Sequence, residues 1–168
     1  EYQAVPKLEE KAYLTAKITD WEQYNLLEGE VNLYFENTYI GKSVLDVRYI
    51  SDTLEVSLGS DKNVQVRREQ ITDFQKRNFI GNKRIETAGH RIWVRNNKAQ
   101  DIRLVIYDQI PVSNNKDIEV ESEELTAGSL DEETGRITWT GTLSAGQEFS
   151  FRNRYSVKYP KDEYLRLE

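Results

Sequence analysis

The class of fold is decided by the stretch FSFRNRYSVKYP, residues 149–160. Its aromatic and aliphatic side chains share one parity: Phe149, Phe151, Tyr155, Val157 and Tyr159. Its other parity is polar: Ser150, Arg152, Arg154, Ser156 and Lys158. A period of two is typical of a β-strand with one buried face, and proline is tolerated only at the margin of such a strand. We therefore predict a long strand that ends at Pro160.

The same period recurs over shorter lengths through most of the chain. It predicts strands within residues 12–18, 31–35, 39–45, 118–120 and 137–139, in addition to two hairpins. Asp131–Gly135 and Ala145-Gly146 have the composition of turns, with Gly135 in the left-handed conformation. Residues 68–77 are short and lack helix caps, so we expect a strand or a connector there.

The first predicted hairpin joins residues 54–58 to residues 64–66. The apolar residues of the two segments share a face only if the loop has an odd number of residues. The loop Gly59–Asn63 satisfies this condition and sets Glu55 opposite Arg67, a pair of opposite charges.

The second predicted hairpin follows from the same test. The loop Asn97–Ala99 aligns Val94 with Ile102 and Ile92 with Leu104. On the outer face it pairs Arg95 with Asp101 and Trp93 with Arg103.

Short strands with turn signals about every ten residues favour an all-β fold. We expect an antiparallel β-sandwich of the immunoglobulin or fibronectin kind in residues 77–168, preceded by a smaller β-rich part in residues 1–76. No linker composition marks the boundary, so one undivided unit is the alternative.

The composition excludes several kinds of site. The 168 residues are 38% hydrophobic and 31% charged, with a net charge of −6, no cysteine and one histidine. This excludes thiolate metal sites, cysteine nucleophiles, disulfides and multi-histidine metal sites, and we expect no cofactor. A domain of this length buries roughly 70% of its unfolded surface and needs no metal to fold. The acidic balance argues against a general surface for nucleic acid or anionic membranes.

Short runs along nearly the whole chain share the pattern of one protein family. The most specific are Asp108–Ser113 (DQIPVS) and Tyr34-Phe35-Glu36. The others are Val5–Leu8, Trp21-Glu22, Leu26-Leu27, Gly29, Asn32, Thr38-Tyr39, Gly41, Leu58-Gly59, Asp61, Arg95–Asn97, Asp117-Ile118, Val120, Tyr155, Val157, Tyr159 and Pro160. Together they resemble the C-terminal region of the mucoidy inhibitor A-like proteins of bacteria, a domain of unknown function.

The resemblance implies a location in the bacterial envelope, periplasmic or exported, because proteins of this family carry an export signal and a coiled-coil portion ahead of this region. It implies no catalytic residue. The chain starts at Glu1 and contains no methionine, so we also expect it to be a piece of a longer protein.

The first candidate site is acidic. The stretch from Asp117 to Glu133 has eight acidic residues and no Lys or Arg. Asp117, Glu119 and Glu121 share one face of a predicted strand. Calcium requires converging oxygen ligands, and this spacing matches no calcium loop, so a solvated acidic edge is the simpler interpretation.

The second candidate site is a partner surface of aromatic and basic residues: Trp93, Arg91, Arg95, Arg103 and Trp21. Aromatic faces stack on sugars and anchor protein interfaces. The alternatives are that arginine stems cover Trp93 within the fold, or that the first, N-terminal part of the chain packs over it.

Three further residues or runs are interpreted as structural. Trp139 shares the parity of Ile137 and belongs to the core. His90 is expected at a strand edge with a satisfied hydrogen bond, because no orienting partner or nucleophile for a catalytic base is identifiable. The run Asp108–Ser113 is expected to bend at Pro111.

We therefore expect a non-enzymatic structural or interaction module of a bacterial cell-envelope protein. Its expected partner is a protein or a glycan, with no nucleic acid and no direct membrane insertion by this segment. One alternative is a carbohydrate-binding module that uses Trp93 or Trp21. The second alternative is a carboxylate-dependent hydrolase, which needs two facing acids in a pocket.

Overall fold

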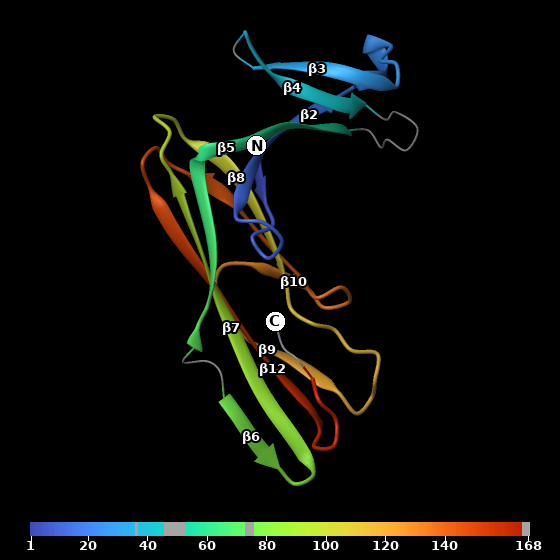
Figure 1. Cartoon of the computed structure of the whole chain (residues 1–168), viewed down its shortest axis with the longest axis vertical. Helices are drawn as coiled ribbons and strands as arrows, with labels where there is room; N and C mark the ends of the chain where they lie inside the picture. The colour runs from blue at the N-terminus through green and yellow to red at the C-terminus, as the bar shows by residue number, and fades with distance from the viewer. Residues whose placement is uncertain (36, 46–52, 73–75, 166–168) are drawn as a thin grey trace.

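The computed structural model describes residues 1–35, 37–45, 53–72 and 76–165 (Figure 1). The strands are β1 (Tyr2–Ala4), β2 (Lys11–Thr19), β3 (Gly29–Phe35), β4 (Thr38–Leu45), β5 (Thr53–Gln70), β6 (Lys76–Ile80), β7 (Lys83–Asn96), β8 (Ile102–Gln109), β9 (Glu119–Leu125), β10 (Ser129–Asp131), β11 (Arg136–Leu143) and β12 (Glu148–Pro160). One short 3₁₀ turn, η1, covers Trp21–Tyr24. The predicted all-β class is confirmed.

Most of the strands belong to one large mixed sheet. Its order is β10-β11-β8-β1-β2-β5-β7-β12-β9, and β6 pairs with β7 as a tenth strand. β1 is parallel to β8 and antiparallel to β2. β3 and β4 form a separate two-stranded hairpin. The ten strands therefore form one connected sheet and do not divide into the two antiparallel sheets expected of a sandwich.

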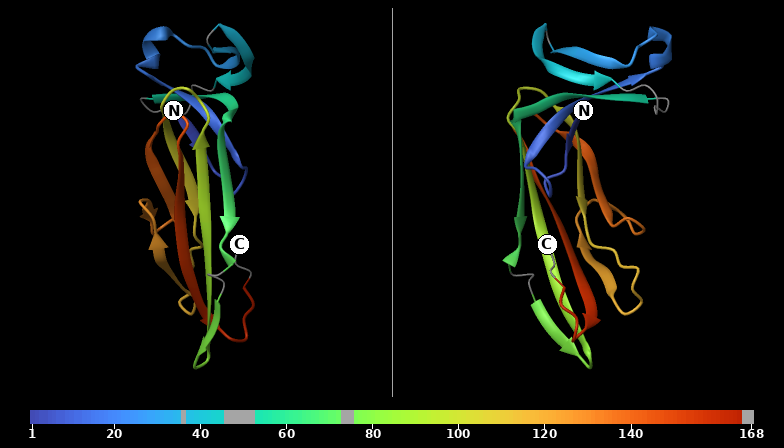
Figure 2. Two further views of the ribbon diagram at one scale, coloured as in Figure 1. Left: turned by 90° about the vertical axis from the view of Figure 1, so that its left-hand side faces the viewer. Right: turned by 45° about the vertical axis from the view of Figure 1, so that its right-hand side comes forward.

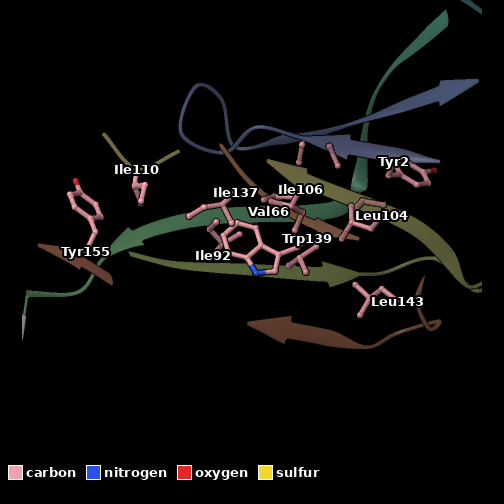
Figure 3. Packing of buried hydrophobic residues seen from close by; sticks show 14 of the residues in the cluster. Tyr2, Val66, Ile92, Leu104, Ile106, Ile110, Ile137, Trp139, Leu143 and Tyr155 are labelled. Carbon is pink, nitrogen blue, oxygen red and sulfur yellow. The ribbon is translucent and has the colours of Figure 1, made fainter. Parts of the chain in front are cut away.

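The large sheet curls until its two ends approach each other (Figure 2). Its terminal strands β9 and β10 are joined by Thr126–Gly128 alone, a connection that spans about 14 Å at most. Side chains of β8 and β11 consequently share one hydrophobic core with those of β5, β7 and β12 (Figure 3). The rings of Trp139 in β11 and Phe151 in β12 lie 5.3 Å apart across this core, although their strands do not pair.

Strands from both parts of the chain contribute to the sheet, since β5 pairs with β7 and β1 with β8. The division of the chain at residue 76 stays a prediction. No helix within the described ranges has the length and apolar character needed to cross a bilayer.

The strands predicted from alternation are confirmed. Residues 149–160 lie in β12, and those at 12–18, 31–35, 39–45 and 137–139 lie in β2, β3, β4 and β11. The strand predicted at 118–120 overlaps β9, which begins at Glu119. Gly135 and Gly146 have φ of 71° and 72°, as the two predicted turns require. Of the connector predicted at 68–77, residues 68–70 end β5 and 76–77 begin β6, while 73–75 fall outside the described residues.

The first predicted hairpin is wrong, because residues 53–70 form one continuous strand, β5. Its first part pairs with β2 and its second part with β7, with irregular register between them. Gly59, with φ of 91°, lies in the irregular part of the ladder with β2, before pairing with β7 begins at Val64. Glu55 consequently lies opposite Lys17, with 3.3 Å between its Oε1 and the lysine Nζ, and Arg67 lies opposite Trp93.

The second predicted hairpin is also wrong, because β7 is flanked by β5 and β12 and never pairs with β8. The buried amide of Asn96 explains the arch between them: its Nδ2 donates to the carbonyl oxygens of Gln100, Leu143 and Ser144, at 2.9 to 3.1 Å. These bonds direct the chain across to the opposite side of the core. Arg95 therefore faces Glu148 at 3.7 Å, and Asp101 accepts a hydrogen bond from the Ala145 amide.

Candidate functional site

An open groove of about 370 Å³ lies between β11 and β12. It is bordered at one end by the connection that crosses at Ala127, and at the other by the β11–β12 connection near Gln147. Its apolar lining comes from both sides of the core: Val94, Leu104, Ile106, Trp139, Phe149 and Phe151. The groove therefore lies where the curled sheet stays open, between β11 and β12, which do not pair with each other.

Two strand edges flank this groove. Residues 139–143 of β11 pair with β8 on one side, and β10 covers only residues 136–138 on the other. Residues 148–151 of β12 pair with β7, and β9 covers only residues 153–158. Within the described residues, each of these two segments therefore has a backbone edge without a strand partner. Such an edge presents N–H and C=O groups to an incoming strand.

Aromatic rings form the floor of the groove. The Phe151 ring lies 5.3 Å from the Trp139 ring and 5.0 Å from the Phe149 ring. The Trp139 Nε1 donates to the carbonyl oxygen of Thr126 at 2.6 Å, which fixes the indole in the core as predicted. Phe149, at the rim, is 49% exposed. The floor is therefore rigid at one end and accessible at the other.

Gly141 keeps the groove open. It has the same parity as Ile137, Trp139 and Leu143, which are buried, but it carries no side chain. A Cβ added at Gly141 would meet no atom within 4 Å, and its φ does not require glycine. By contrast, a Cβ at Gly128 would lie 2.6 Å from Trp139 Nε1, so that glycine is needed for close packing. An inward-facing glycine within an alternating strand is the sequence signal that could have revealed the groove.

A buried polar cluster lies at the other end of β8. Asp108 Oδ2 accepts from Arg68 Nε at 3.2 Å and from Asn153 Nδ2 at 2.9 Å, and its Oδ1 accepts from the Gln109 amide at 2.9 Å. The Asp108 side chain is fully buried. Because Arg68 is in β5 and Asn153 in β12, Asp108 ties β8 to the opposite side of the core. This role shows why the DQIPVS run has an aspartate at its first position.

His90 joins this cluster from β7, and its predicted place is corrected. It is buried within the sheet rather than at a strand edge, and its Nδ1 has no hydrogen-bond partner in the described structure. Its ring stacks on that of Tyr155 at 6.5 Å. Burial, followed by the positive charge of Arg68, lowers the pKa of His90 from 6.5 to about 4. The imidazole is therefore neutral at physiological pH.

This pKa predicts a loss of stability in mild acid. Between pH 6.5 and 4 the unfolded chain binds a proton at His90 and the folded chain does not, so the free energy of unfolding falls as pH falls through this window. We expect a loss of about 1 kcal/mol between pH 7 and pH 5.5. Urea unfolding at both pH values measures it. The variant His90→Phe should show no such loss, and an equal loss in this variant would contradict the assignment.

The acidic stretch forms the wall of a second hollow, of about 630 Å³. Glu121, Glu132 and Glu133 line it, opposite residues 110–114 of the DQIPVS region. Asp117 is exposed, and Glu119 is held by Lys83 Nζ at 2.8 Å and by Lys158 Nζ at 3.0 Å. These two lysines lower the pKa of Glu119. In the described residues, no three His, Asp or Glu side chains are grouped as a metal site requires.

The residues of the predicted partner surface lie on separate elements. Trp93 is half-buried on β7, where the Arg67 guanidinium lies 5.9 Å from its ring. Arg91 and Arg95 are exposed on the same strand. Arg103 lies on β8, where its Nε is 3.3 Å from Glu1 Oε2. Trp21 is half-buried in η1. The structure thus brings Trp93 near Arg91 and Arg95 on one strand, but it places Arg103 and Trp21 elsewhere.

Comparison with known proteins identifies a family but no activity. The chain is similar to Protein F37C4.5 of Caenorhabditis elegans, with 24% identity over 177 residues. The alignment covers 98% of this chain but only 32% of that protein, so the chain spans about a third of its relative's length. No solved structure matches the chain. A family model described as "Domain of unknown function (DUF4139)" matches residues 3–161, and the chain therefore belongs to this family.

Proposed function

We propose that the chain is a non-enzymatic interaction module that binds an extended polypeptide segment in the groove between β11 and β12. The observation that carries the proposal is the pair of unpartnered strand edges on either side of an apolar floor. An extended peptide placed there would hydrogen-bond to a sheet edge, while its alternate side chains would contact the floor.

The dimensions of the groove fit a short strand. Residues 139–143 provide an edge of five residues, which corresponds to about 15 Å of extended chain. Gly141 provides room for one apolar side chain of the ligand, since nothing lies within 4 Å of its missing Cβ. The ligand that fits best therefore has apolar residues at alternate positions.

We also propose a bacterial subfamily, a cellular location and a sandwich-like arrangement for the chain. The DQIPVS run and the family match support membership of the mucoidy inhibitor A-like proteins and a location in the bacterial envelope. Packing of β8 and β11 against β7 and β12 supports a sandwich-like scaffold whose two layers are joined through β1, β2 and β5. For the carbohydrate and hydrolase alternatives, no observation is as specific as the two strand edges.

The groove is tested by filling it. We expect Gly141→Leu to weaken binding of the capped peptide KVTVTVK at least roughly tenfold, because the leucine occupies the space meant for a ligand side chain. Stability should be unchanged or higher, since leucine suits a strand better than glycine. Calorimetric titration measures the binding, and urea unfolding measures the stability.

The matched control is Ser150→Leu, which adds a leucine at an exposed position of β12 that alternates with Phe149 and Phe151 and does not line the groove. It should bind the peptide as the wild type does. Equal binding by wild type and Gly141→Leu, or the same loss in both variants, would show that the groove is not the binding site.

A further inference from the structure

The hairpin formed by β6 and β7 projects at one end of the molecule's longest axis (Figure 1). Its tip carries two large apolar residues that are mostly exposed: Phe79 is 60% exposed and Ile80 is 63% exposed. Gly81, with φ of 57°, makes the turn that places them at the apex. The separate β3–β4 hairpin lies at the opposite end (Figure 2). The tip can therefore reach a surface without obstruction from the rest of the fold.

Basic residues surround these two apolar residues. The segment of residues 76–84 contains four basic residues, Lys76, Arg77, Lys83 and Arg84, and no acidic residue. Lys161, from the segment after β12, places its Nζ 5.4 Å from the centre of the Phe79 ring. The Arg84 guanidinium lies 5.6 Å from the same ring. The tip thus combines an apolar apex, Phe79 and Ile80, with a basic collar formed by Lys83, Arg84 and Lys161.

Nearby acids neutralise only part of this collar. Glu119 is shared between Lys83 and Lys158. Glu86 is buried, and its Oε1 accepts a hydrogen bond from the Tyr159 hydroxyl at 2.5 Å. Two further exposed acids, Asp162 and Glu163, directly follow Lys161, and Asp73 precedes Lys76 by three positions in the sequence. All 29 acidic residues lie outside residues 76–84, and eight of them lie between residues 117 and 133.

We propose that the β6–β7 tip docks on the surface of an anionic lipid bilayer. Phe79 and Ile80 would enter the boundary between headgroups and acyl chains, while Lys83, Arg84 and Lys161 stay among the phosphates. Basic residues near an anionic leaflet and apolar side chains at its boundary both favour such binding. The tip has both an apolar apex and adjacent cations. An anionic bilayer matches both features, since its apolar layer lies behind its phosphates, whereas an acidic partner protein would match the cations alone. In this arrangement the tip rests on one leaflet of the bilayer and does not cross it.

The proposal revises what net charge alone suggests. An acidic chain is repelled from an anionic membrane when its charge is spread evenly, but at 0.1 M salt charges more than about 10 Å from the leaflet are largely screened, so the charges at the tip matter more than the net charge. The proposal is independent of the groove, because the tip shares no residue with it.

Vesicle sedimentation tests this inference. We expect the chain to bind vesicles of phosphatidylcholine mixed with phosphatidylserine, to bind phosphatidylcholine vesicles much less, and to dissociate at high salt. The double variant Phe79→Ser/Ile80→Ser should weaken binding by roughly tenfold for each side chain. The control is Leu27→Ser, an apolar residue that is 84% exposed, outside the tip. It should bind as the wild type does.

A labelled variant shows insertion directly. Because the chain has no cysteine, Ile80→Cys accepts an environment-sensitive fluorophore at one place only. Its emission should shift to shorter wavelength with anionic vesicles, whereas the same label at Leu27→Cys should not respond. Absence of binding to anionic vesicles at low salt, unchanged binding by the double variant, or an equal shift at both labels would overturn the proposal.

Discussion

Replacing Asp108 by alanine is expected to lower the free energy of unfolding by about 3–5 kcal/mol, because it leaves Arg68, whose side chain is only 14% exposed, without its counter-ion. It also removes the acceptor for Asn153 Nδ2 and for the Gln109 amide. The loss should exceed that of an ordinary truncation since three donors from three strand regions converge on one carboxylate. Urea unfolding of the wild type and of Asp108→Ala measures it.

Two comparisons make this prediction specific. The exposed pair of Lys42 and Glu30 has its Nζ and Oε1 2.6 Å apart, and Glu30→Ala should cost less than about 1 kcal/mol because solvent screens that pair. The double variant Asp108→Leu/Arg68→Met should recover much of the loss, since an apolar pair leaves no buried charge uncompensated. A loss for Asp108→Ala as small as that for Glu30→Ala would show that Asp108 does not tie the sheet together.

Replacing Gly135 by alanine is expected to cost about 3 kcal/mol, through strain and a direct clash. Gly135 has φ of +71°, which L-residues rarely adopt, and its added Cβ would lie 2.3 Å from the carbonyl oxygen of Ile110. Ile110 also donates its amide hydrogen to the Gly135 carbonyl oxygen at 2.9 Å. The substitution would therefore force apart the turn before β11 and the segment that follows β8.

Gly146 provides a matched control. Its φ is +72°, nearly that of Gly135, but nothing lies within 4 Å of its missing Cβ. Gly146→Ala should cost only about 1 kcal/mol, the value for the left-handed conformation alone. The difference between the two variants, measured by urea unfolding, isolates the contact with Ile110. Equal losses would mean that backbone conformation alone explains the glycine at position 135.

Alternation in the sequence located the strands but could not pair them. Parity is satisfied equally by a hairpin and by a strand that continues past Gly59 to a new partner, as β5 does. The arch between β7 and β8 depends on the amide of Asn96, whose acceptors include Leu143 and Ser144, more than forty positions away. Pairing was thus decided by long-range hydrogen bonds to buried polar groups, and periodicity carries no information about these.

The sequence identified parts of the candidate sites without their partners. DQIPVS stood out as a motif, yet Asp108 acts with Arg68, His90 and Asn153, which come from three other strands. The groove arises from Gly141 facing inward between Trp139 and Leu143, and its two edges become visible only when β8 and β7 take the other sides of β11 and β12. The net charge of −6 is summed over the whole chain and gave no sign of the basic residues beside Phe79 and Ile80.

Backbone amide exchange tests the central claim, that the groove between β11 and β12 receives an extended strand. Exchange is measured by NMR with and without saturating KVTVTVK peptide. We predict slower exchange at alternate amides within residues 139–143 or 148–151, and no such change in Gly141→Leu. Unchanged exchange in both segments, or the same protection in Gly141→Leu, would contradict the proposed function.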